Sequence, residues 1–586
     1  MINNITKLIS FLSRENYYRL GLVALLLITA GVAEMVTLAT SAPFLRGLSG
    51  GGIGTGVFSD NLFLTHMSET LNLTKVQSIA IQFCAAFCFA SFVRVIIVAA
   101  NADLSFQIGN TLGELAFSNA LRRSYQDSKQ VHSSLDVVAI TNYVNTVIFS
   151  VLFPVVTIIT SAVLIVALLS ALVHMMGFEV IYGISLIGAI YALLIYGMRN
   201  RLTRLGASIN QEAANTLRVL QEALASFREI KLGSFENTMI RKFSRHDKEL
   251  RHSQGTALIY QMTPRYFVEA MAIFLLIMTV ILIDSAEVKE SNTLIIIGSL
   301  LIGLQRLLPN AQQLFQSWAS LRTGEEALEN IVKSIGSIVT TNSPGNTFAS
   351  SSNFGGKFKI LRFENVSFAY GENEDPIFTN LTLEIKAGSR TGITGPSGGG
   401  KSTFVDLLSG LLKPTKGSIS IDGIDIWSDV SGWYRRIAYV PQSIHLADTS
   451  IRDNIGFGIA TDCIDNEQVR RSAHIAGLDP VLRRLSNGID TLVGEKGGLL
   501  SGGERQRVGI ARAAYKDADL IIFDEATSAL DAESENIINA YIRALDSSVT
   551  VVIIAHKQSA LIDCDTILRV ESGKVFQENP FVKSLK

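Results

Sequence analysis

A phosphate-binding loop is predicted at residues 395–402. Its residues are Gly395, Pro396, Ser397, Gly398, Gly399, Gly400, Lys401 and Ser402, with Thr403 following, and they fit G-x-x-x-x-G-K-[ST]. The glycines allow positive φ angles, so backbone N–H groups can turn toward a phosphate chain. Lys401 can neutralise the β- and γ-phosphates of a nucleotide, and the Ser402 hydroxyl can ligate Mg²⁺. The alternative is a flexible glycine-rich turn, but an expected strand at 389–394 and an expected helix at 404–409 favour the phosphate site.

A second group of candidate catalytic and metal-binding residues lies downstream, where an apolar stretch from residue 519 ends in Asp524 and Glu525. Asp524 at the end of a strand would hold Mg²⁺, directly or through water. Glu525 would orient or deprotonate a water that attacks the γ-phosphate. Two carboxylates after a strand are a weak signal alone, but after a phosphate loop they predict nucleotide hydrolysis.

The composition predicts a membrane part joined to a water-soluble part. Of the 586 residues, 48% are hydrophobic and 18% are charged. The net charge of −1 gives no reason to expect nucleic acid as a partner. The four cysteines have no spacing typical of a metal site or a disulfide framework.

Six stretches are long and apolar enough to be helices that cross a bilayer. They are residues 20–45, 78–101, 142–171, 173–197, 266–284 and 293–318. No small-residue cleavage site precedes the first one, so it is expected to be a retained span. An even number of spans places both ends of this region on one side of the membrane.

Charge predicts which side that is. Residues 198–265 contain twelve Lys and Arg against six Asp and Glu, whereas the connection at 284–290 is mostly acidic. The positive-inside rule therefore places 198–265, and with it the termini, in the cytoplasm.

The whole chain divides into three parts by composition. Residues 1–336 form the expected transmembrane domain, 337–356 form a linker rich in Ser, Thr, Asn and Gly, and 357–586 form a soluble α/β nucleotide-binding domain. The connections at 102–141 and 198–265 have helical periodicity, which favours membrane helices that extend into the cytosol. Their far ends, at 116–127 and 219–230, are expected to contact the soluble domain, although surface helices without that role are the alternative. A short amphipathic helix is expected at 60–71 in the outer loop, or a simple loop in its place.

The sequence Leu500-Ser-Gly-Gly-Glu-Arg-Gln-Arg507 matches the signature of ATP-binding cassette (ABC) transporters. On this motif and on the order of spans and cassette, the chain resembles a bacterial exporter-type half transporter. The resemblance implies a multidomain fold, with a six-helix transmembrane domain followed by an α/β P-loop nucleotide-binding domain. It also implies that ATP and Mg²⁺ are the cofactors. One chain carries one set of motifs, so a homodimer with two ATP sites is expected.

The resemblance carries roles to particular residues. Tyr370 matches the aromatic residue that stacks on adenine, Gln442 the glutamine that contacts Mg²⁺ and water, and Glu495 an acidic residue that exporters set against the intracellular helices. Asp531 resembles the loop residue that meets its symmetry mate, and His556 the histidine that senses the γ-phosphate. Glu525, His556 and Gln442 are thus the expected catalytic residues.

The signature residues are expected to bind the nucleotide of the second chain. They are Ser501, Gly502, Gly503 and Glu504. Glu504 replaces the commoner Gln of the family, and Lys557 follows the histidine where Arg is frequent, but neither change should abolish hydrolysis.

Three arginines are candidate substrate ligands. Arg94 and Arg306 fall inside expected spans, and Arg265 falls at the start of another, one turn before Glu269. Charged residues within spans are costly and often functional. If they face a cavity they would attract a phosphate or pyrophosphate head group. The alternatives are a structural ion pair for Arg94 and Arg306, and an interfacial, snorkelling position for Arg265.

The spans are most similar to those of the bacterial flippase for lipid-linked oligosaccharides used in protein glycosylation. The residues that carry the likeness are 92–94, 263–269 and 305–311, although Gln313 stands where that relative has a cationic residue. The resemblance implies a polyprenyl-pyrophosphate glycan as an anionic lipid-linked substrate and the bacterial inner membrane as the location. Another lipid such as a lipid A precursor, amphipathic drugs, and an ATP-gated channel are the alternatives.

Overall fold

The computed structural model describes residues 2–10, 14–48, 74–130, 133–176, 180–284, 290–340, 354–371, 374–525, 539–555, 557–571 and 573–578. The expected amphipathic helix at 60–71 and most of the linker lie outside these residues. The chain forms two compact units, one of residues 1–123 and 131–343, the other of residues 124–130 and 344–586.

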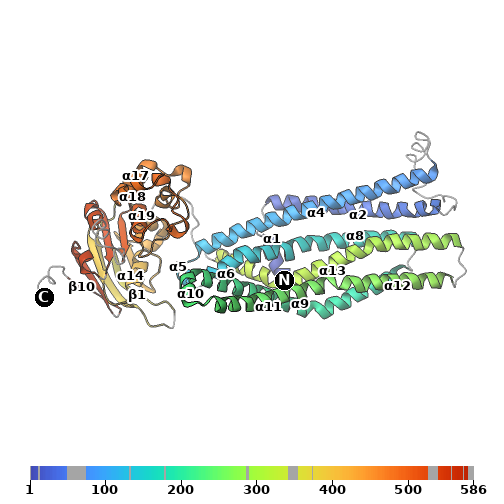
Figure 1. Ribbon diagram of the computed structural model, residues 1–586, viewed down its shortest axis with the longest axis horizontal. Helices are drawn as coiled ribbons and strands as arrows, with labels where there is room; N and C mark the ends of the chain where they lie inside the picture. The colour runs from blue at the N-terminus through green and yellow to red at the C-terminus, as the bar shows by residue number, and fades with distance from the viewer. Residues whose placement is uncertain are drawn as a thin grey trace. The chain divides into compact units, whose positions relative to one another are not determined.

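The first unit is built from long helices that run side by side, with short helices between some of them (Figure 1). In chain order its helices are α1 (Ile2–Ser10), α2 (Arg14–Leu48), α4 (Lys75–Arg122), α6 (Ser133–Val138), α7 (Val144–Val147), α8 (Phe153–Met176), α9 (Val180–Ala225), α10 (Phe227–Gly233), α11 (Glu236–Met262), α12 (Pro264–Asp284) and α13 (Glu290–Thr340). The segment that joins α4 to α8 contains two π-helical stretches, Ala139–Tyr143 and Ile148–Leu152.

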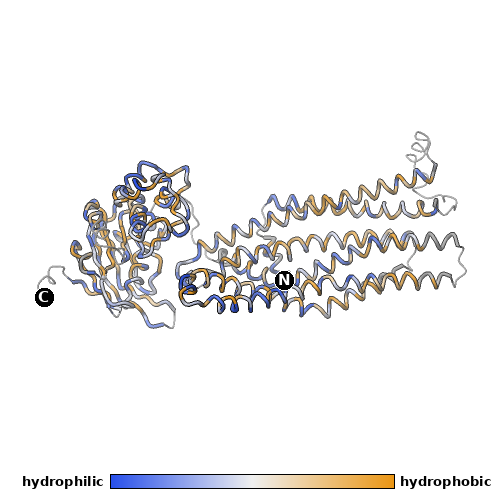
Figure 2. Tube along the Cα trace, in the orientation of Figure 1, coloured by the Kyte–Doolittle hydropathy of each residue, from blue (hydrophilic) through white to orange (hydrophobic). Residues whose placement is uncertain are grey.

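Three stretches of the described residues are long and apolar enough to cross a membrane, namely Arg14–Arg46, Val76–Arg122 and Asp136–His174. They contain the first three expected spans. The other three fall mainly on α9, α12 and α13. Both long connections are helical, since α4 continues to Arg122, while α9, α10 and α11 cover nearly all of 198–262. In Figure 2 the hydrophilic residues of this unit gather around α10 and α11.

Helix α13 packs closely against its neighbours at one level. A Cβ at Gly206 of α9 would lie 2.3 Å from the carbonyl oxygen of Thr323, and a Cβ at Gly324 would lie 2.8 Å from Cβ of Ser150. Neither distance is possible for a real Cβ, so both positions require glycine. Adjacent residues of α13 are thus fixed between α9 and the second π-helical stretch.

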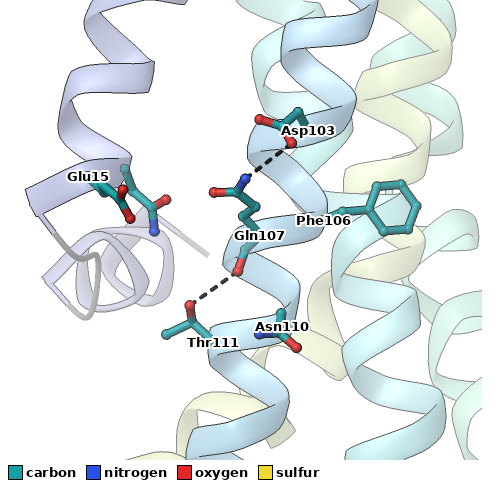
Figure 3. A pocket seen from close by; sticks show the side chains of 7 residues that line it. Glu15, Asp103, Phe106, Gln107, Asn110 and Thr111 are labelled. Atoms are coloured by element: carbon teal, nitrogen blue, oxygen red, sulfur yellow. Dashed lines mark hydrogen bonds between the residues drawn. The ribbon is translucent and has the colours of Figure 1, made fainter.

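A polar groove of about 420 Å³ lies beside the first turn of α2 and the C-terminal half of α4 (Figure 3). Its lining residues are Glu15, Asn16, Asp103, Phe106, Gln107, Asn110 and Thr111. Gln107 donates to Asp103 at 3.1 Å, and Arg19 of α2 pairs with the same carboxylate. The ion pair joins the two helices at this level.

The second unit contains two β-sheets. The strands of the antiparallel sheet are β1 (Ile360–Phe368), β2 (Phe378–Lys386), β4 (Lys416–Ile421) and β5 (Ile424–Asp425), in the order β2-β1-β4-β5. The strands of the other sheet are β3 (Arg390–Thr394), β6 (Ile437–Val440), β7 (Leu520–Asp524), β8 (Thr550–Ile554), β9 (Thr566–Glu571) and β10 (Lys574–Glu578), in the order β10-β9-β3-β8-β7-β6. All neighbours in this second sheet are parallel except β9 and β10.

Helices surround the sheets. They are α14 (Lys401–Leu408), α15 (Val430–Arg436), α16 (Ile451–Ile455), α17 (Asn466–Ile475), α18 (Asp479–Arg484) and α19 (Gly502–Tyr515). Because β3, β6, β7 and β8 are parallel, the segments that follow them emerge at one edge of the sheet. That edge therefore receives the phosphate loop after β3, Gln442 after β6, and Asp524 with Glu525 at the end of β7.

The short helix α5 (Tyr125–Gln130) belongs to the second unit, although the chain on either side of it belongs to the first. A division by sequence position alone leaves it in the transmembrane part. Tyr125 packs against the core between the two sheets, so the far end of the first long connection contacts the nucleotide-binding unit, as expected.

Candidate functional site

The phosphate loop has the backbone that its glycines predict. Gly395, Gly398 and Gly400 have φ angles of 150°, 78° and 101°, and α14 begins directly after them. Lys401 donates through Nζ to the carbonyl oxygens of Gly395 at 2.9 Å and Pro396 at 3.0 Å, which holds its ammonium group across the loop. Pro396, Ser397, Gly398 and Ser402 are exposed, whereas Lys401 is buried. This cradle of amide groups, ammonium and hydroxyl fits a triphosphate with Mg²⁺.

The carboxylates lie at the same sheet edge. Gln442 donates through Nε2 to Oε2 of Glu525 at 2.8 Å, which joins two of the expected catalytic residues. Glu525 has a φ of 47°, an unfavourable left-handed conformation for a non-glycine residue, and its N–H donates to the carbonyl oxygen of Ile554 in β8. Burial raises the pKa of Asp524, and the neighbouring carboxylates of Glu525 and Asp406 act in the same direction.

Tyr370 lies beside the phosphate loop. Its hydroxyl is 3.2 Å from Oγ1 of Thr403, and its ring packs edge-on against Phe368. The structure therefore brings Tyr370, the residue expected to stack on adenine, next to the residues that would hold phosphate.

Helix α5 contacts the same region. Gln126 donates to the carbonyl oxygen of Tyr370 at 3.0 Å, and Lys129 pairs with Asp406 of α14 at 2.8 Å. The Lys129 ammonium also lies 5.7 Å from the centre of the Tyr370 ring. Desolvation acts to lower the pKa of Lys129, but the hydrogen bond to Asp406 and the attraction of its charge together outweigh desolvation, so the pKa of Lys129 is raised.

The signature residues form the start of α19. Ser501 is the N-cap: its hydroxyl accepts from the N–H of Glu504 at 3.3 Å, and Glu504 accepts from the N–H of Ser501 at 2.8 Å. Glu at this position completes the capping box as well as the commoner Gln would. Burial would raise the pKa of Glu504, but the bonds with Ser501 and Arg484 outweigh it and lower that pKa. Ser501 and Gly502 are exposed and Gly503 is half-buried.

Asp531 and His556 lie outside the described residues.

Arg94 and Arg306 form an ion-pair cluster with Glu34 of α2. Nη2 of Arg94 lies 2.7 Å from Oε1 of Glu34, and Nη1 of Arg306 lies 2.7 Å from Oε2. The Glu34 side chain is 1% exposed, and the Arg306 guanidinium lies 4.1 Å from the centre of the Phe87 ring. Arg94 and Arg306 therefore do form a structural ion pair, which was the alternative to their role as substrate ligands.

The cluster has more donors than acceptors. Two arginines and one glutamate leave one positive charge, and Nε of Arg94 and Nη2 of Arg306 are buried with no acceptor among the described residues. Arg265 is separate from this cluster, because it pairs with Glu269 one turn along α12, at 2.6 Å on an exposed surface.

Sequence reasoning missed Glu34, Lys129, Asp406 and Tyr439 as members of these sites. Glu34 was detectable as a carboxylate inside an apolar stretch, which requires a partner. The other three residues carry no pattern that separates them from ordinary surface or core residues.

Comparisons with known proteins agree with this architecture. Residues 378–528 match the ABC transporter family. The chain is 43% identical over 221 residues to the ATP-dependent lipid A-core flippase of Ralstonia nicotianae, a match that covers 37% of each protein. It is 30% identical over 422 residues to the ATP-dependent lipid A-core flippase of Nitrosococcus oceani, which covers 72% of this chain and 69% of the relative.

The matched region thus spans little more than a third of the Ralstonia relative and about two thirds of the Nitrosococcus one. Among solved structures, a bacterial Atm1-family ABC exporter with ATP bound superimposes with a TM-score of 0.78 over 96% of both chains, at 23% identity, which shows the fold. An N-terminal helical unit and a C-terminal P-loop unit in this order are the exporter arrangement. The chain therefore belongs to the ABC transporter family, as a bacterial exporter-type member.

Proposed function

We propose that two copies of this chain form an ATP-driven flippase that moves a phosphate-bearing glycolipid across the bacterial inner membrane. The observation that carries the ATPase part is the meeting of the phosphate loop, Asp524 and the Gln442–Glu525 pair at one edge of a parallel sheet. A phosphate cradle without carboxylates would bind nucleotide only, whereas carboxylates in these positions supply a metal ligand and a base.

In this proposal each residue acts on ATP in a definite way. Lys401 exchanges its bonds with the loop carbonyls for bonds with phosphate oxygens, and Tyr370 stacks on adenine. Ser402, Gln442 and Asp524 hold Mg²⁺, which neutralises phosphate charge when bound. Glu525 takes the proton of the attacking water.

The remaining cassette residues complete the site across the dimer. The exposed Ser501 and Gly502 bind the γ-phosphate held by the partner chain, with Glu504 fixing the turn that presents them. Asp531 and His556 keep the roles of the family loops in which they lie.

The proposed membrane arrangement has six spans within residues 1–336, a linker at 337–356 and a cytoplasmic nucleotide-binding domain at 357–586. The basic segment at 198–265 and the termini are cytoplasmic. Lys129 and Gln126 of α5 then connect the end of a membrane helix to the P-loop helix and to Tyr370.

The proposed substrate carries phosphate because the Arg94–Glu34–Arg306 cluster keeps one positive charge and unused guanidinium donors. Guanidinium groups bind phosphate oxygens through paired N–H groups, and a low-dielectric surrounding strengthens that attraction. A polyprenyl-pyrophosphate glycan is the first candidate, with Arg265 as a further ligand near the interface. A lipid A-core glycolipid is the second, favoured by the names of the relatives.

Reconstitution in proteoliposomes tests the proposal. Fluorescent polyprenyl-pyrophosphate glycan and fluorescent lipid A-core are supplied separately, with ATP and Mg²⁺, and loss of signal to a membrane-impermeant quencher reports movement. The unchanged protein should move the first lipid, and Arg94→Gln and Arg306→Gln should slow it at least tenfold while leaving basal ATPase activity intact. Movement of lipid A-core alone would select the second candidate. ATP-dependent ion conductance without lipid movement would overturn the flippase proposal.

A further inference from the structure

Tyr439 lies in β6, three residues before Gln442, and its hydroxyl donates to Oδ2 of Asp524 at 2.7 Å. The register of the sheet explains the contact. Tyr439 pairs with Ile522 of the parallel strand β7, so Asp524, two residues further along, points to the same face of the sheet. The tyrosine therefore reaches the carboxylate diagonally across two neighbouring strands.

This hydrogen bond is the one side-chain hydrogen bond recorded to Asp524 among the described residues. A phenol that donates to a carboxylate makes a short, charge-assisted bond. The carboxylate lies near two others, Asp406 and Glu525, so it has negative neighbours that would otherwise disfavour its charge. A fixed donor on one oxygen limits the rotation of the carboxylate about χ2.

We propose that Tyr439 is a positioning residue for Asp524: its hydroxyl occupies Oδ2 and leaves the other carboxylate oxygen, Oδ1, for the Mg²⁺ of the nucleotide. The inference rests on the proposed function, in which Asp524 holds that ion. Hydrogen-bond partners of metal-binding carboxylates fix the ligand before the metal arrives, and removing such a partner costs about 10- to 100-fold in metal affinity. Tyr439 does not contact the nucleotide in this proposal, so nucleotide binding without metal is independent of it.

The chain supplies a matched control. Tyr434 of α15 is also a half-exposed tyrosine of the second unit, and its hydroxyl donates to the carbonyl oxygen of Gly410 at 2.9 Å. Tyr434→Phe and Tyr439→Phe remove the same atom and one hydrogen bond each, but only the second changes the surroundings of Asp524.

The experiment uses the full-length protein in lipid nanodiscs. Binding of a fluorescent N-methylanthraniloyl-ATP is measured first in EDTA and then during a Mg²⁺ titration, and bound Mn²⁺ is counted by electron paramagnetic resonance at saturating nucleotide. In EDTA the unchanged protein and both variants should bind equally. In the titration Tyr439→Phe should need about 10- to 100-fold more Mg²⁺ for half-saturation and should retain less Mn²⁺, whereas Tyr434→Phe should match the unchanged protein.

An unchanged or lower half-saturating Mg²⁺ concentration in Tyr439→Phe would overturn the inference, because the hydroxyl would then be neutral or a competitor of the metal. Equal loss in both tyrosine variants would also overturn it, since the effect would be structural. If the unchanged protein binds no nucleotide in EDTA or with Mg²⁺, the proposed function itself fails, and the inference fails with it.

Discussion

Glu34 is expected to be a main support of the helical unit, and Glu34→Gln tests this. The side chain is 1% exposed and lies 2.7 Å from a guanidinium nitrogen of each of two arginines. At an effective dielectric constant of about 20, each contact has a gross attraction of about 6 kcal/mol, most of which offsets the cost of removing the charges from water. Glutamine keeps the shape and removes the charge, which leaves two guanidinium cations side by side, the Arg306 side chain 11% exposed and that of Arg94 35% exposed. The expected loss in free energy of unfolding is about 3–5 kcal/mol.

The assay is thermal and denaturant unfolding of the purified protein in one detergent, followed by intrinsic fluorescence. Glu329→Gln is the control, because the Glu329–Lys333 pair is exposed, and its loss should cost at most about 1 kcal/mol. The double variant Glu34→Gln with Arg94→Gln restores a single positive charge. It should therefore be more stable than Glu34→Gln alone.

Two results would refute this reasoning. One is a Glu34→Gln protein as stable as the Glu329→Gln control. The other is a double variant whose destabilisation is the sum of the single effects, because uncoupled residues are additive and an ion-pair cluster is not.

Three further predictions concern the nucleotide-binding unit. Glu525→Gln should lower the ATPase rate at least about 100-fold while MgATP binding persists, and normal turnover would exclude Glu525 as the base. Lys129→Met should leave the buried Asp406 carboxylate without its cation and lower the stability of the unit by about 1–3 kcal/mol, whereas adding Asp406→Asn should recover part of that loss in the same melt; no recovery would contradict the pairing. Burial acts to raise the pKa of Glu504, but hydrogen bonds with Ser501 and Arg484 outweigh burial and hold this pKa below its ordinary value. The Glu504 carboxylate therefore stabilises the fold above the ordinary pKa, and this stabilisation is lost as the pH falls through the folded-state pKa. Melting temperatures should thus fall more steeply between about pH 5 and pH 3 for the unchanged protein than for Glu504→Gln, and parallel curves would argue against this role.

The nucleotide site was predictable because its chemistry depends on short stretches of chain. Positive φ at Gly395 and Gly400 follows from glycine itself, and parallel strands bring Gln442 and Glu525 to one edge wherever the loops between them run. The strand before the loop was expected within one residue of its bounds, and the helix after it begins three residues earlier than its expected stretch at 404–409.

The Arg94–Glu34–Arg306 cluster was only half predictable. Arg94 and Arg306 are conspicuous in apolar stretches, but their partner depends on how α2, α4 and α13 pack, and no local pattern encodes that. The same holds for Tyr439 and Lys129, whose partners lie 85 and 277 residues away in the chain. The six-span count stays a prediction, since three stretches of the described residues meet the criterion of length and apolarity.

The close packing of α13 at Thr323 and Gly324 makes this level the point about which the helix would tilt as a rigid body. The contacts with Gly206 and Ser150 leave 33 residues of the helix on one side of Thr323 and 17 on the other. At 1.5 Å per residue these arms are about 50 Å and about 25 Å long. A tilt of about 5° about this point would move the Thr340 end by about 2 Å and the Glu290 end by about 4 Å in the opposite direction. Small displacements at the Thr340 end would thus be doubled and inverted at the Glu290 end.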